Sequence, residues 1–158
     1  VLLVSGLLLI FLGLDILSSP WVLTVASLIP LGISMGLAEE YFPKWKKYFK
    51  WFAAVGFLAI AITSIGGMDT LKKIAVPLFH GVAGLVIFLG PFFAKKAPQG
   101  FFWVGIGGVL IGLGGIALAF ISMGKQLLFF SPEFVMAILT PLLLLMTSAF
   151  AWGFTKKG

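Results

Sequence analysis

Long apolar segments separated by short connections occupy nearly the whole chain, and this feature most restricts how it can fold. Six segments can be distinguished, with residue ranges 1–17, 20–38, 51–65, 74–93, 101–123 and 134–154. A helix needs about 20 apolar residues to cross the hydrocarbon layer of a bilayer, so four of the segments have the required length and the first and third are short. The pattern predicts an all-α integral membrane protein whose six transmembrane helices form three hairpins.

The composition agrees with a membrane protein that has small loops. Of the 158 residues, 61% are hydrophobic and 10% are charged. Soluble domains contain about 25% charged residues, so the low charged fraction argues against a soluble fold. No polar stretch is long enough to form a second domain, and we expect a single transmembrane domain over residues 1–158. The chain starts in an apolar run without a basic segment before it, so no signal peptide is indicated.

The lysines predict the orientation of the helices. One side of the predicted bundle carries eight of them: Lys44, Lys46, Lys47, Lys50, Lys95, Lys96, Lys156 and Lys157. The other side carries three: Lys72, Lys73 and Lys125. Because basic residues are enriched in cytoplasmic loops, we expect both termini to lie in the cytoplasm. We expect the protein to lie in the plasma membrane. The same distribution accounts for the net charge of +6, so no nucleic-acid partner is expected.

The connection at 41–50 has an amphipathic pattern of its own. Aromatic residues recur at helical spacing, and lysines fill the remaining arc. We expect a short helix, started by Pro43, that lies in the lipid headgroup layer. Its expected lipid-interface residues are Lys44, Trp45, Lys46, Lys47 and Lys50. A docking surface for a protein partner is the alternative.

The segment 101–123 carries a row of small residues spaced three or four apart. The row consists of Gly105, Gly108, Gly112, Gly115, Ala119 and Ser122. Glycine costs about 1 kcal/mol in a water-exposed helix, but in lipid the backbone must stay hydrogen-bonded, so the helix persists and a second helix can approach closely. Gly32 and Gly36 form a similar GxxxG pair in the segment 20–38. These residues predict tight helix packing, either within the chain or with probable membrane-protein partners or further copies.

His80 is the only histidine and the only ionisable residue well inside a predicted span. Such a residue is a candidate for a proton relay or for a single contact with haem or quinone. Ligation of haem by two histidines of this chain is excluded, because the chain has no second histidine. The alternative is a histidine that hydrogen-bonds to a neighbouring helix and serves packing alone.

Ser27 and Thr140 are predicted at about the same depth as His80, and Asp15 lies near the outer end of the first segment. Together these four residues could line a small polar intramembrane site. The competing account is that both hydroxyls donate to carbonyls of their own helices one turn earlier, and that Asp15 is an interfacial residue.

Sequence patterns of enzymes are missing from the chain. It contains no cysteine, and neither a metal-ligand cluster nor a catalytic constellation can be recognised. We therefore expect no catalytic residues and no metal, and a protein that is not itself an enzyme, although it could be a subunit of a membrane enzyme complex.

Three functions fit these observations. The favoured one is a non-catalytic accessory or structural subunit that packs in a larger membrane complex, such as an electron-transport or ion-pumping assembly. The second is a small proton-linked carrier or channel with a polar site around His80. The third is a redox membrane anchor in which His80 contacts haem or quinone.

Overall fold

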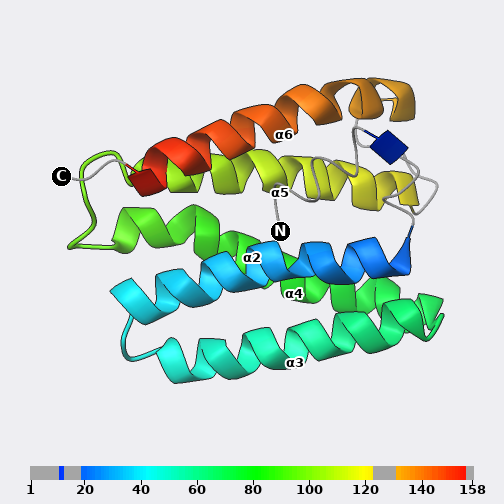
Figure 1. Ribbon diagram of the computed structural model, residues 1–158, viewed down its shortest axis with the longest axis horizontal. Helices are drawn as coiled ribbons and strands as arrows, with labels where there is room; N and C mark the ends of the chain where they lie inside the picture. Colours follow the sequence, from blue (N-terminus) through cyan, green and yellow to red (C-terminus); the bar gives the residue numbers. More distant parts are fainter. Residues whose placement is uncertain (1–10, 13–18, 123–130, 156–158) are drawn as a thin grey trace. The chain divides into compact units, whose positions relative to one another are not determined.

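The computed structural model describes residues 11–12, 19–122 and 131–155, and its main elements are α-helices. The helices are α2 (Pro20–Tyr41), α3 (Lys46–Ile65), α4 (Asp69–Phe93), α5 (Phe102–Ser122) and α6 (Pro132–Thr155) (Figure 1). No strand occurs in these ranges. Four helices, α2, α3, α4 and α6, are long and apolar enough to cross a membrane, and α5 is apolar over Phe102–Ala117, the part whose side chains are described. The predicted all-α class with membrane-compatible helices is confirmed.

The described part of the chain holds five helices, so the six predicted spans are supported only in part. The predicted first span, 1–17, lies outside that part except for residues 11–12. The remaining five predicted segments fall on α2 to α6. Several helices extend beyond the apolar segment, and α3 starts at Lys46 rather than Trp51. Backbone hydrogen bonding can continue past the last apolar side chain, so hydropathy alone underestimates helix length.

The separate helix predicted from Pro43 is not formed. Helix α2 continues to Tyr41, and a short turn follows in which the Trp45 N–H donates to the Phe42 carbonyl at 2.8 Å. Lys46 then begins α3. Nucleating an isolated turn is unfavourable, whereas these residues extend an existing helix at little cost. Their position in the lipid headgroup layer stays a prediction.

The turns use the residues that the sequence offers for them. At the start of α6 the Ser131 hydroxyl accepts a hydrogen bond from the Phe134 N–H at 3.2 Å, as an N-cap does. At the end of α3 the Met68 N–H donates to the Thr63 carbonyl at 2.9 Å, and Gly67 has φ +66°. This left-handed residue closes the helix and suits glycine, which has no Cβ to clash.

The chain groups into two compact units rather than one, Val1–Ala83 and Gly84–Gly158, with the division inside α4. In the first unit α2 packs antiparallel against α3 (Figure 1). Both helices bury residues at about every third or fourth position, and most of these residues are small or hydroxyl-bearing. They are Thr24, Ser27, Leu31, Ser34, Leu37 and Ala38 in α2 and Ala53, Gly56, Ile60, Thr63 and Ser64 in α3. Small side chains on both helices let the two backbones approach closely.

The first half of α4 completes the core of this unit. Ala83 is fully buried and clusters with Leu31 and Ala53. The ring of Phe79 lies against Gly56, where an added Cβ would be 2.5 Å from the ring. Bulky rings therefore fill the space that small residues leave.

In the second unit α5 packs antiparallel against α6 and also contacts the second half of α4. A Cβ added at Gly105 would be 2.8 Å from the Phe88 carbonyl oxygen, and one added at Gly108 would be 2.9 Å from the Phe88 nitrogen. The partner of the glycine row, which the sequence does not identify, is α4 for these two positions. Because backbone atoms bound the space, a side chain there cannot be accommodated by rotating a neighbour.

Replacing Gly108 by Ala is expected to lower the free energy of unfolding by about 1–3 kcal/mol, because α5 must move away from the α4 backbone. Gly115→Ala on the same helix is the matched control, since an added Cβ meets nothing within 4 Å of it. The control is expected to be neutral or stabilising by up to about 1 kcal/mol through helix propensity. Denaturant titration of the detergent-solubilised protein, followed by circular dichroism, measures both. Equal effects of the two substitutions would contradict the close approach.

Candidate functional site

Ser27 was one of the residues expected in a polar intramembrane site. Its side chain is fully buried in α2, and its hydroxyl donates to the Thr24 carbonyl at 2.7 Å. The Thr24 hydroxyl in turn donates to the Pro20 carbonyl at 2.7 Å. The account in which Ser27 bonds to its own helix is confirmed, and its hydroxyl proton is not available to a ligand.

Two other buried hydroxyls are satisfied in the same way, whereas the buried Ser64 hydroxyl has no hydrogen-bond partner in the described part of the chain. Ser34 donates to the Leu31 carbonyl at 3.0 Å, and Thr63 donates to the Ala59 carbonyl at 2.7 Å. Sequence analysis did not single out these two residues. Their spacing from the other small residues could have predicted that they are buried, because residues three or four positions apart lie on one helix face.

The structure does not group the other two expected members of the polar site with Ser27. Thr140 is exposed on α6 and belongs to the second unit, whereas Ser27 and His80 belong to the first. Asp15 lies outside the described residues. Of the four expected residues, the first unit therefore holds two: Ser27, whose hydroxyl is already hydrogen-bonded, and His80.

His80 keeps an unsatisfied polar atom. It lies on the face of α4 that also carries Ala83 and Ile87, both buried, and its Nδ1 is buried without a hydrogen-bond partner in the described part of the chain. The Val76 carbonyl, one turn earlier, lies close to the ring but does not satisfy this nitrogen. A buried polar atom without a partner costs about 1–3 kcal/mol. Of the four expected site residues, His80 is thus the one whose surroundings favour a further partner.

The expected helix-packing glycines divide into two groups. Gly105 and Gly108 contact α4, as described above. Among the described residues, Gly112, Gly115, Gly32 and Gly36 have no neighbour within 4 Å of an added Cβ, and the last three are exposed. The side chain of Ala119 lies outside the described residues.

The structure also shows packing glycines that the sequence row does not include. Gly107 lies against the Phe150 ring, where an added Cβ would be 2.7 Å away, and Gly153 lies 2.8 Å by the same measure from the Val104 nitrogen. These residues hold α5 to α6. Helix α5 therefore uses two different faces, and a single row of small residues reveals only one of them.

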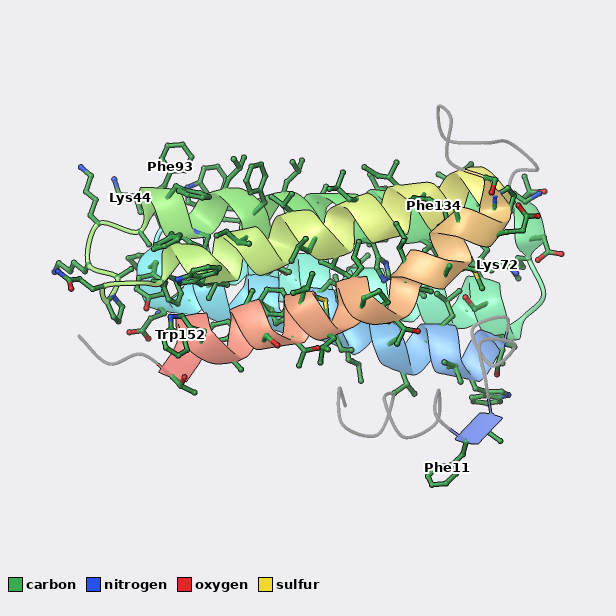
Figure 2. All side chains as sticks on the ribbon, turned by 90° about the horizontal axis from the view of Figure 1, so that it is seen from above. Phe11, Lys44, Lys72, Phe93, Phe134 and Trp152 are labelled. Atoms are coloured by element: carbon green, nitrogen blue, oxygen red, sulfur yellow. The ribbon has the colours of Figure 1, made fainter. Side chains whose placement is uncertain are left out.

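The expected lipid-interface residues are exposed, as are the neighbouring Tyr48 and Trp51. This exposed group is here called the lysine–aromatic cluster and consists of Lys44, Trp45, Lys46, Lys47, Tyr48, Lys50 and Trp51. The Trp45 and Tyr48 ring centroids are 6.1 Å apart. Figure 2 shows Lys44 and Lys72 at opposite ends of the first unit. The cluster therefore occupies one end of its helices.

Metal-binding chemistry has no counterpart in the described ranges, where no group of three or more His, Asp or Glu residues could hold a metal ion. Comparison of the chain with protein families, with curated proteins and with solved structures finds no match. The functional inference depends on the chemistry of the residues described above.

Proposed function

We propose that the protein is a non-catalytic polytopic membrane protein, an accessory or structural subunit that packs in a larger membrane complex. An electron-transport or ion-pumping assembly is a natural host for such a subunit. The observation that carries the proposal is the pair of open glycine faces, Gly32–Gly36 on α2 and Gly112–Gly115 on α5, where an added Cβ would meet nothing within 4 Å.

Open glycine faces matter because apolar side chains gain little by leaving lipid for another apolar surface. Association of membrane helices depends instead on close packing, which small residues permit. Within the chain, Gly105 and Gly108 show how close such an approach becomes. The open faces offer the same geometry to a helix of another protein or of another copy.

Four buried hydroxyls of the first unit support the same proposal, while a fifth, that of Ser64, has no hydrogen-bond partner in the described part of the chain. The hydroxyls of Thr24, Ser27, Ser34 and Thr63 donate to carbonyls of their own helices. Bonds of this kind serve the helix and offer no free donor to a solute. Support for a structural role thus comes from both the surface and the interior.

We further propose a topology of six spans in three hairpins, with both termini in the cytoplasm and the protein in the plasma membrane. The support is the excess of lysines on one side, eight against three. Lys44 and Lys72, which represent the two groups, lie at opposite ends of the first unit (Figure 2).

One observation favours a second candidate function. The buried, unsatisfied Nδ1 of His80 suits a proton-linked carrier or channel, or a redox anchor in which this nitrogen contacts haem or quinone. Both alternatives assign to His80 a role that packing alone does not need.

The complex is tested by measuring the mass of the gently solubilised native particle and identifying its components. The wild type is expected to co-purify with different subunits. Gly36→Leu is expected to release them, because the added side chain prevents close approach, while the chain stays folded. Ala54→Leu adds a side chain at an exposed position of α3 and is expected to leave the particle intact. A particle that contains this chain alone would contradict the proposal.

His80 separates the accessory function from its alternatives. The purified protein is expected to conduct no more protons than empty liposomes, measured with an entrapped pH-sensitive dye, and His80→Ala is expected to change nothing. Flux by the wild type that the substitution abolishes, with helicity unchanged, would favour the carrier. A haem absorption band that disappears with the substitution would favour the redox anchor.

Orientation is tested with single cysteines, since the chain has none of its own. Met68→Cys and Lys96→Cys both introduce a thiol at an exposed position. A membrane-impermeant maleimide is expected to label Met68→Cys in intact cells and Lys96→Cys only after permeabilisation. The reverse pattern would place the lysine-rich side outside.

A further inference from the structure

We propose that the lysine–aromatic cluster binds the phosphate headgroup of an anionic phospholipid, with an acyl chain along α3. The proposal does not depend on the host complex, so it can fail or succeed separately from the proposed function. It follows from the charges, the exposed rings and the apolar surface that continues below them.

The lysines of the cluster are exposed and form no ion pair. Lys44, Lys46, Lys47 and Lys50 lie within one turn and the start of α3, and the one ion pair in the described ranges joins Lys72 to Asp69 at 2.6 Å. The nearby Glu39 and Glu40 form no ion pair with these lysines. The cluster therefore presents four uncompensated cations.

Their place on the helix makes them mutually unfavourable. Lys46 and Lys50 are four residues apart, and Lys47 and Lys50 are three apart, so like charges are neighbours. The first turn of α3 contains no acidic residue, and its positive dipole end disfavours cations. In α4 and α6 the first turn carries Asp69 and Glu133. An external anion would relieve the repulsion at α3.

Exposed aromatic rings place this anion in a membrane. Trp45, Tyr48 and Trp51 are 61%, 69% and 66% exposed. Amphipathic rings of this kind are enriched where the hydrocarbon layer meets water. A soluble anion would gain nothing from them, whereas a phospholipid places its phosphate beside the lysines and its glycerol region beside the rings.

An apolar stripe continues from the cluster along α3. Trp51, Val55, Leu58 and Ile62 are exposed at helical spacing and share one face. At 1.5 Å per residue the stripe is about 16 Å long, which is close to the thickness of one hydrocarbon leaflet. Lys47 precedes Trp51 by one turn, so a cation stands at the head of the stripe. The surface thus matches a phospholipid in both charge and length.

The test titrates the intact, detergent-solubilised protein with dioleoylphosphatidylglycerol or dioleoylphosphatidylcholine, with native mass spectrometry to count bound lipid. The wild type is expected to prefer the anionic lipid by at least about tenfold, since each lysine near an anionic lipid surface contributes measurably to binding. Equal binding of the two lipids would overturn the proposal. It would favour an acidic protein partner as the ligand of the cluster.

Two variants locate the site. Lys46→Gln/Lys47→Gln is expected to reduce the preference at least about fivefold. The matched control, Lys95→Gln/Lys96→Gln, also removes two adjacent exposed lysines without an ion pair and is expected to retain it. Equal losses would show an effect of net charge only and would contradict the assigned site. Full displacement of the lipid by millimolar inorganic phosphate would also contradict it, because the acyl chain would then contribute nothing.

Discussion

The structure depends on one constraint, the need of every backbone N–H and carbonyl in an apolar segment to find a partner. In lipid there is no water to supply one, so each long apolar segment is expected to form its own helix. The constraint also explains why α2 and α6 continue through Pro30 and Pro141. A missing hydrogen bond at proline costs less than unwinding the segment around it.

With the backbone satisfied inside each helix, packing decides how the helices associate. The two units use the same means with different residues. In the first, hydroxyl-bearing residues such as Ser27 and Thr63 are buried and bond to carbonyls of their own helices. In the second, glycines such as Gly108 bring α5 against the α4 backbone. Both solutions reduce side-chain bulk at the helix contacts.

The proposed partners contact the surface that lies outside these helix contacts. Open glycine faces favour contact with other membrane helices, and the lysine–aromatic cluster favours contact with lipid headgroups. His80 Nδ1 is buried and unsatisfied, as is the Ser64 hydroxyl, whereas the hydroxyls of Thr24, Ser27, Ser34 and Thr63 are hydrogen-bonded. A structural role and a lipid site are compatible, since subunits of membrane complexes are held both by one another and by the lipid around them.

The sequence by itself determined the helical class and the approximate position of five helices, because hydropathy and backbone hydrogen bonding are local properties of a segment. It also identified Gly105 and Gly108 as packing positions. Only the tertiary structure showed that α4 is their partner, that Gly112 and Gly115 remain open, and that α3 begins at Lys46. These features depend on which faces meet, and many pairings of small residues satisfy the same spacing rule.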